Sequence, residues 1–541
     1  SLSDAMYALR KQIVLAERDG LFRAASAATI TTHFLSMMLS CFKKPTDPPG
    51  STLFKSLPKA SQVDLFLSHS WSCPSWMKLL ALCHFLNLDL AIISSITAST
   101  MAVVFFVIFA GNISNVAAVV PHWSLYVCLF YWPLSIFLLT YLFGHLCRGD
   151  ISFWFDRVCV DQQNLWVKVQ TLQAVPAFVA QSTDLLVLWD HTLFQRLWCN
   201  YELAVHAKTS VSEKHIHFVP MWTAMWCLCW LGMYVIIGLS LYGTTVSPLY
   251  VDANSPYISM SVSLWKMYAV PLPAFFVIAL PFSYFCFHKL DEHKSMLEQM
   301  AHFDVRNAKC TLETDRRVIE EQVLDLFDEA LEPSLRVAFD GTDSTPSLDA
   351  DEEPLLPETV DDFRHITSYP SKDEVIEQFN EYVRGPLRDN VLNSVGQESG
   401  ISFKLCLVAI LPLEWIGWVA ILGCDGRADC QKSAACWGYG SVAHYMAGNI
   451  VVNLILLPLS MTAVPPLMLR INHLVVHFPS RRLRFLAGSC FTATVLFIWG
   501  VFLYCLVALF LLATTQFTLP AFAAFMVAFG LLIFVNCSFF I

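Results

Sequence analysis

Long apolar stretches recur along the whole chain and are separated by polar segments. Eight of them carry few charges, and each has the length of about 20 residues that a helix needs to cross the hydrocarbon core of a bilayer. The chain is 56% hydrophobic and only 14% charged, which is typical of a polytopic α-helical membrane protein. We predict spans at 90–110, 124–144, 223–242, 265–287, 403–422, 450–469, 485–513 and 519–541.

Shorter apolar runs have a different pattern. Residues 63–67, 155–160 and 185–189 are each followed by a polar loop, which is typical of buried strands in an α/β domain. Residues 216–222 have the pattern of a further strand that merges into the third span. Because the first two predicted spans separate the first run from the second, we expect a membrane hairpin to be inserted into this domain.

The helix predicted after the third run carries the most specific motif. Residues 196–203 read Arg-Leu-Trp-Cys-Asn-Tyr-Glu-Leu, and Phe66, Leu67 and Ser68 end the first run. Together these segments resemble the TIR domain, the flavodoxin-like module of Toll-type and plant-type immune receptors, over roughly a quarter of the chain. The motif is similar to the W-C-x-x-E-L helix of that family, whose glutamate is catalytic in members that cleave NAD. The resemblance implies a flavodoxin-like (TIR-like) fold, protein partners, and NAD as a candidate substrate with Glu202 as its catalytic residue.

The chemistry of NAD cleavage suits a glutamate at this position. A carboxylate at the carboxyl edge of a sheet can bind ribose hydroxyls and stabilise the oxocarbenium-like state. The residues that we expect to contact the nucleotide are Ser68, His69, Ser70, Trp71, Asp161 and Trp198. Two alternatives stay open: Asp161 is also a common turn residue, and Glu202 could pair with Arg196 or Lys208 in an inert docking module. The histidines and cysteines near the motif lack zinc-ligand spacing, so we predict no metal site.

Two further features lie in the predicted membrane region. Cys424, Cys430 and Cys436 share one loop between spans, which predicts a disulfide with one leftover thiol on an oxidising side. Glu414 stands inside the fifth span, where an ionisable side chain is costly and marks a functional candidate. We expect Asn453 and Asn536 to be its polar partners; the alternative is a protonated Glu414 that is hydrogen-bonded between packed helices.

The distribution of positive charge predicts the orientation. Four arginines lie in the loop 470–484, whereas the loops assigned to the opposite side contain only Arg427 and Lys432. We therefore place both termini, the TIR-like domain and residues 288–402 in the cytoplasm. The predicted division begins with amphipathic helices over 1–60, where 21–42 is either an interfacial helix or a helix packed on the soluble domain. It continues with a TIR-like domain over 61–89 and 148–222, transmembrane hairpins over 90–147 and 223–287, a helical and acidic linker over 288–402, and a four-span domain over 403–541.

These features favour a membrane-anchored TIR-like protein of signalling or assembly, with NAD nucleosidase activity left open. The alternatives are a structural subunit of a large membrane complex with an inert TIR-like docking module, and a channel or transporter that uses Glu414. The net charge of −10, without a basic stripe, argues against a nucleic-acid partner. We expect membrane lipids and proteins as partners, in an oligomer or complex. Because the chain starts at Ser1 and stops inside an apolar run, we expect it to belong to a longer protein.

Overall fold

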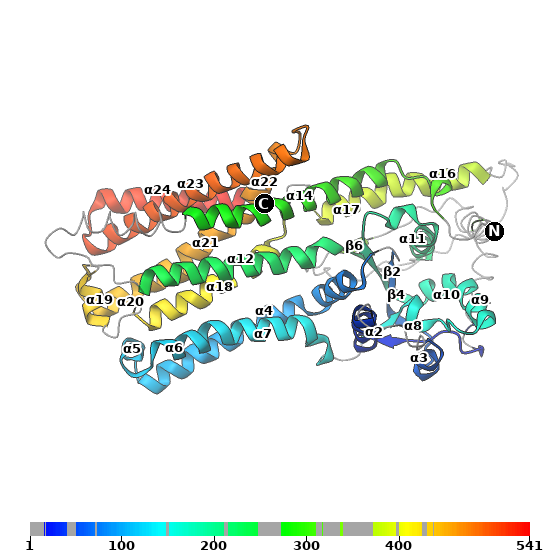
Figure 1. The fold of residues 1–541 in the computed structure, drawn as a ribbon, viewed down its shortest axis with the longest axis horizontal. Helices are drawn as coiled ribbons and strands as arrows, with labels where there is room; N and C mark the ends of the chain where they lie inside the picture. The colour runs from blue at the N-terminus through cyan, green and yellow to red at the C-terminus, as the bar shows by residue number, and fades with distance from the viewer. Residues whose placement is uncertain are drawn as a thin grey trace, which may run out of the picture.

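The chain forms a sheet domain and a helical bundle, which occupy the two ends of an elongated molecule (Figure 1). The computed structural model describes residues 14, 16, 18–40, 50–70, 73–147, 151–209, 215–246, 272–309, 316, 336–338, 372–395, 400–424, 430–436 and 438–540. Within these residues, six helical segments are long and apolar enough to cross a membrane. They are Ser75–Ala110, His122–Leu146, Phe403–Leu422, Val442–Val475, Arg481–Thr515 and Leu519–Phe540.

The sheet has six strands in the order β1-β3-β2-β4-β5-β6. Its strands are β1 (Ala25–Ser26), β2 (Val63–His69), β3 (Ser152–Trp154), β4 (Ser182–Trp189), β5 (His215–Pro220) and β6 (Arg336–Ala338). Only the short edge strand β1 is antiparallel, and all the other pairs are parallel. Numbered along the chain, the parallel strands have the order 2-1-3-4-5, which is one of the two common orders of doubly wound sheets. In this order the direction of winding reverses between β2 and β4.

Three of the predicted strands are confirmed, and one is misplaced. The runs 63–67 and 185–189 lie in β2 and β4, which pair directly with Leu65 opposite Asp184, and the run 216–222 overlaps β5 up to Pro220. The prediction for 155–160 is wrong, because β3 ends at Trp154 and α8 (Asp156–Cys159) follows. An aspartate in the first turn favours a helix start through the helix dipole. The apolar groups 153–155 and 158–160, which two charged residues separate, therefore belong partly to a strand and partly to a helical turn.

The centre of the sheet is buried on both faces. Leu185, Leu188 and their neighbours in β4 are at most 1% exposed, as expected for parallel strands that are covered by helices on both sides. Phe66 of β2 stacks on Trp154 of β3, with ring centroids 4.7 Å apart. Trp154 in turn lies 5.4 Å from Phe178 of α10 (Val175–Ala180). These rings join the strands and a covering helix into one core.

Residues beyond the predicted hairpin 223–287 complete this domain. β6 pairs with β5 and adds a strand that the sequence analysis did not predict. α16 (Lys372–Tyr382) and α17 (Arg388–Val395) bury Phe379 and Val391 in the same core. This part of the region 288–402 is thus packed structure rather than linker. The acidic segment 340–362 lies outside the described residues.

The first helix of the described chain also belongs to the sheet domain. α2 (Ala27–Ser40) buries Ile30 and Phe34 in the core. The hydroxyl of Thr31 lies 2.9 Å from Nε2 of His145, close to the end of the first hairpin. Of the two alternatives for 21–42, the structure therefore favours the helix packed on the sheet domain over the interfacial helix, because the apolar side chains of α2 contact the protein core. Most of the remaining residues before position 18 lie outside the described part.

Helices pass directly from the sheet domain into the bundle (Figure 1). α4 (Ser75–Ala110) begins shortly after β2 and packs along α7 (Trp132–Phe143), while α12 (Met221–Val246) follows β5 without a loop. α14 (Leu272–Ala301) buries Met296 and Met300 in the core of the sheet domain. Six of the eight predicted spans coincide with the six apolar segments named above. The third and fourth fall on α12 and α14, whose connection lies outside the described residues.

In the bundle, α18 (Phe403–Leu422) contacts α4, α12, α20 (Val442–Val451) and α21 (Leu457–Thr462). Beside them, α23 (Arg481–Thr515) packs on α14, α22 (Val464–Val475) and α24 (Leu519–Phe540). Pro412 stands inside α18, and prolines stand in the first turns of α21 and α22. Neighbouring helices can satisfy the carbonyl groups that such prolines free, so packing alone explains them.

Candidate functional site

A hydrogen bond between Ser68 and Glu202 marks the candidate site. Ser68 lies near the carboxyl end of β2, and Glu202 lies in the second turn of α11 (Leu197–Thr209), the helix that follows β4. Oγ of Ser68 donates to Oε2 of Glu202 over 2.6 Å. Since winding reverses between β2 and β4, this contact lies at the topological switch point, where open α/β sheets bind their ligands. We call the polar residues around this contact the switch-point site: Ser68, His69, Ser70, Lys78, Asp156, Asp190, Thr192 and Glu202.

The protonation of Glu202 is governed by its surroundings. Burial raises the pKa of Glu202 to about 8, the hydrogen bond from Ser68 acts against this rise, and the negative charge of Asp156 adds to it. The carboxyl group is therefore mostly neutral at pH 7, and a cationic ligand beside it would favour the ionised form. No residue in the described part of the chain forms an ion pair with Glu202. Arg196, one alternative partner, does not contact it, and the side chain of Lys208 lies outside the described atoms.

His69 links two charged residues on the other side of this loop. Its Nε2 lies 3.2 Å from Oδ1 of Asp156, and its Nδ1 lies 3.3 Å from Nζ of Lys78. Burial acts to raise the pKa of Asp156, but the charge and hydrogen bond of His69 outweigh it and hold the pKa below its usual value. Lys78 is only 5% exposed although it belongs to the first turn of α4. The sequence gives little sign of its role, since a lysine early in a helix is usually solvated.

Ser70 begins a second chain of hydrogen bonds. Its Oγ lies 2.5 Å from Oγ1 of Thr192, which donates to Oδ1 of Asp190 over 2.8 Å. Asp190 directly follows β4, so the loops after β2 and β4 are tied together across the switch point. The sequence analysis did not select Asp190 or Thr192, although a polar pair at the end of a strand is a usable signal. Both serines of the loop are 1% exposed.

The other predicted contact residues are placed differently. Trp71 lies outside the described residues. Asp161 is buried, and its Oδ1 accepts the backbone N–H groups of Gln163 and Asn164, which is the turn alternative given above. Trp198 is half-buried and packs on the domain core, with its ring 6.2 Å from that of Tyr201. The structure thus brings Ser68, His69 and Ser70 together with Glu202, whereas Asp161 stabilises a turn.

No family model, curated protein or solved structure matches this chain. The chemistry of the site therefore rests on its own geometry. The described residues contain no cluster of three or more His, Cys, Asp or Glu side chains that could hold a metal ion. The site offers hydroxyl groups, one carboxyl group with a raised pKa, and a buried histidine between an aspartate and a lysine.

The cysteine loop of the bundle contains one disulfide. Cys424 is bonded to Cys430, with Cα atoms 5.3 Å apart. Cys436 ends α19 (Cys430–Cys436), and its side chain lies outside the described atoms. Ser433 adds a hydrogen bond to the carbonyl of Cys424, so this short loop is closed twice. The feature stabilises the end of α18 and is separate from the switch-point site.

The predicted polar partners of Glu414 bond to other groups. Asn453 donates to the carbonyl of Asn449 over 3.0 Å. Asn536 accepts a hydrogen bond of 2.6 Å from Thr462 and donates to backbone carbonyls. The prediction of an Asn–Glu414 cluster is therefore wrong: Asn453 bonds within its own helical segment, and Asn536 bonds to Thr462 and backbone carbonyls. Glu414 itself is half-buried in α18.

Proposed function

We propose that this protein is a membrane-anchored, TIR-like signalling or assembly protein whose sheet domain cleaves the N-glycosidic bond of NAD. The Ser68–Glu202 hydrogen bond at the switch point carries the proposal, because it holds a carboxyl group where a nucleotide would bind in this strand order. The W-C-x-x-E-L helix and the 2-1-3-4-5 order support a TIR-like domain. The positive charges of loop 470–484 support a cytoplasmic position for this domain.

The proposed reaction uses the unusual protonation of Glu202. The nicotinamide ring of NAD carries a positive charge, which lowers the pKa of a neighbouring carboxyl group and favours its ionised form. The ionised Glu202 then stabilises the oxocarbenium-like ribose as the bond to nicotinamide breaks and its electron pair stays on the ring nitrogen. Water adds to the ribose carbon and releases a proton. Ser68 acts as a positioning residue that orients the carboxyl group.

The direct test is nicotinamide release from NAD by the purified full-length chain in mild detergent. We expect slow release from the wild type and at least a hundredfold loss in Glu202→Gln, the order of effect of removing one stabilising group. Glu298→Gln is the matched control, because Glu298 is an exposed glutamate of α14. It should retain wild-type release. Equal rates for the wild type and Glu202→Gln, with both proteins folded, would refute the catalytic role.

A docking module is the second candidate, and a specific observation favours it. Ser68 and Ser70 are buried, and their hydroxyl groups already have hydrogen-bond partners inside the domain. A site whose polar groups are satisfied can simply be structural. In that case the wild type releases no nicotinamide, and the sheet domain contacts another protein of a complex. The mass of the particle purified in mild detergent then exceeds that of the chain in its micelle.

A further inference from the structure

α14 and α23 pack along each other, and both helices change from apolar to polar at the same level of the bundle (Figure 1). The apolar part of α14 ends at Phe287, and that of α23 begins at Phe485. The two changes coincide in space, because Arg484 pairs with Asp291 at 3.5 Å and Phe287 packs against Gly488, where a Cβ atom would come within 2.7 Å of its ring. Such a boundary on spanning helices marks the level of the lipid headgroups.

A groove lies between the two helices at this boundary, and we call it the boundary groove. It measures about 560 Å³ and is open to the outside, within the range of about 300–1,000 Å³ that is typical of sites for small ligands. Its apolar end is lined by three aromatic side chains, those of Tyr284, Phe287 and Phe485. Its polar end is lined by charged side chains from both helices. The groove therefore suits a molecule with one charged and one apolar end.

The charges at the polar end do not cancel. Arg484 and Asp291 form an ion pair with each other. Arg481 and Arg482, in the first turn of α23, are exposed, and Glu292 of α14 is half-buried. None of these three side chains forms an ion pair with another residue in the described part of the chain. The groove thus offers two unpaired positive charges and one unpaired negative charge.

These three charges define the ligand that complements them. A guanidinium group binds a phosphate or a carboxylate through paired N–H donors, and a glutamate accepts hydrogen bonds from an ammonium group. The complementary ligand therefore carries two negative groups and one positive group. The headgroup of phosphatidylserine has this composition, because it contains a phosphate, a carboxylate and an ammonium group. Phosphatidylglycerol lacks the carboxylate and the ammonium group, so it is the natural comparison.

The surroundings of the groove also fit a lipid. Leu280 and Tyr284 of α14 and Leu486 of α23 are 42%, 48% and 58% exposed, so acyl chains have an apolar surface to follow. The positive charges of loop 470–484 place this level at the cytoplasmic face. Phosphatidylserine is a major anionic lipid of that leaflet, and basic pockets between spanning helices on this side bind anionic headgroups.

We propose that the boundary groove binds the headgroup of phosphatidylserine. Arg481 and Arg482 bind the phosphate and the carboxylate, Glu292 accepts from the ammonium group, and the aromatic end contacts the glycerol backbone. The bound lipid connects α23 with α14, which continues into the sheet domain and buries Met296 and Met300 there. The inference is independent of the NAD chemistry.

The test measures the lipid that the full-length chain retains. The protein is reconstituted in nanodiscs of phosphatidylcholine with equal minor shares of phosphatidylserine and phosphatidylglycerol, released into mild detergent, and weighed by native mass spectrometry. We expect the wild type to retain phosphatidylserine over phosphatidylglycerol by about threefold or more. Arg481→Gln/Arg482→Gln should lower the retained phosphatidylserine by about tenfold or more. The control Lys55→Gln/Lys294→Gln makes the same change of charge at two exposed lysines outside the groove and should retain lipid like the wild type.

A second variant tests the choice of headgroup. Glu292→Gln keeps the size of the side chain and removes the partner of the ammonium group, so the preference for phosphatidylserine over phosphatidylglycerol should disappear. Unchanged retention of phosphatidylserine in the arginine variant would overturn the site, and equal retention of both lipids by the wild type would overturn the headgroup. Glycerophosphoserine, added in detergent, is the probe for a soluble source. Its binding to the wild type without any retained lipid would overturn the lipid assignment.

Discussion

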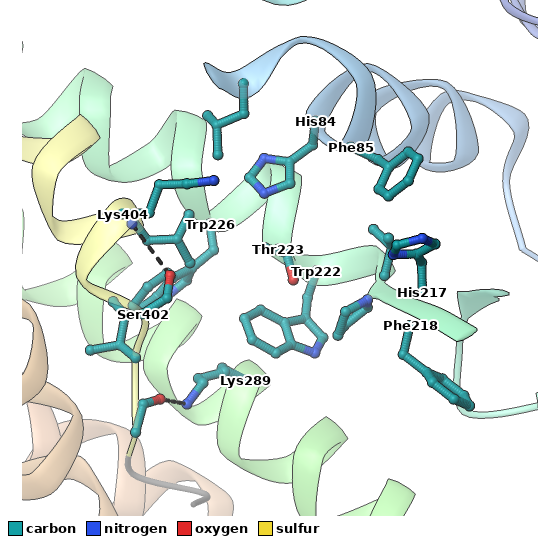
Figure 2. A pocket seen from close by; sticks show the side chains of 16 residues that line it. His84, Phe85, His217, Phe218, Trp222, Thr223, Trp226, Lys289, Ser402 and Lys404 are labelled. Atoms are coloured by element: carbon teal, nitrogen blue, oxygen red, sulfur yellow. Dashed lines mark hydrogen bonds between the residues drawn. The ribbon is translucent and has the colours of Figure 1, made fainter. Parts of the chain in front are cut away.

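The switch-point site and the start of α12, where the sheet domain passes into the bundle, both hold buried polar groups, but the hydrogen bonding of these groups differs. At the switch point, each serine hydroxyl has a partner inside the domain, and His69 lies between Asp156 and Lys78. At the start of α12, the buried indole N–H groups of Trp222 and Trp226 (Figure 2) have no acceptor in the described chain. The hydroxyl groups of the first region therefore have partners, whereas the second region holds two donors without acceptors.

Because of this difference, we expect substitutions in the two regions to change the stability of the protein by different amounts. A group that already has a partner leaves that partner unsatisfied when it is removed, which is destabilising. A group that lacks a partner can be replaced by an apolar one of similar shape at little cost, because nothing is left behind. Stability measurements on the two regions should therefore give effects of different size, and the following predictions go from the largest to the smallest.

The largest effect is expected from Asp156→Asn. The substitution removes the carboxylate beside His69 and leaves two basic groups facing each other in a buried loop. We expect a loss of about 2–3 kcal/mol, in the range for buried charged hydrogen bonds. The measurement is denaturant unfolding in detergent, followed by a probe in the sheet domain. Asp291→Asn serves as control, because Asp291 is an exposed partner of Arg484. Equal losses of stability in both variants would show that the charge of Asp156 contributes no more to stability than an exposed charge does.

An intermediate effect concerns pH. The folded pKa of Glu202 is about 8, raised by burial above its ordinary value. Between about pH 4.5 and pH 8 the folded state therefore holds a proton that the unfolded state has lost, so stability decreases as the pH rises through this range. Glu202→Gln has no proton to lose, and its stability should decrease less. Thermal unfolding midpoints of both proteins across this range provide the measurement. Parallel curves would show that Glu202 titrates normally.

The smallest effect is expected from Trp226→Phe. The ring remains packed beside Trp230, while the unsatisfied N–H group disappears. In lipid-free detergent, the stability should stay within about 1 kcal/mol of the wild type. Trp226→Ala is the matched control, since losing the whole buried ring should cost about 3–5 kcal/mol. A large loss in Trp226→Phe would mean that the indole N–H has a hydrogen-bond partner in the folded protein.

Local patterns in the sequence were enough to identify the bundle and part of the sheet. The long apolar stretches contain few charged residues that would argue against a membrane-crossing helix, and six of the predicted spans coincide with apolar helices. β2 and β4 are continuous apolar runs, and Glu202 was placed opposite Ser68 because helix α11 follows a strand of the same sheet. β3 was misplaced because the apolar groups 153–155 and 158–160 do not show by themselves where the strand ends and the helical turn begins.

Contacts between residues that are distant in sequence could not be predicted from such local patterns. Nothing near Phe379 indicates that it packs on a sheet whose first strand, β1, lies about 350 residues earlier. Lys78 is buried only because β2 and α8 bring His69 and Asp156 together beside it. The pocket beside Trp222 and Trp226 likewise combines four distant parts of the chain, namely α4, β5 with α12, α14 and the start of α18, so Lys289 and Lys404 have no common signal in the sequence.

The length and continuity of α4 determine how the first hairpin responds to movement at the switch-point site. It runs for 36 residues from the loop after Ser70 to Gly111 without an internal glycine or proline, which corresponds to about 54 Å of continuous helix. Kinks usually need such residues, so α4 should behave as a stiff rod. Its first turn holds Lys78 at the switch-point site, and its far end lies at the opposite extremity of the bundle (Figure 1). Any displacement of that first turn is therefore transmitted as a tilt along the whole length of the molecule.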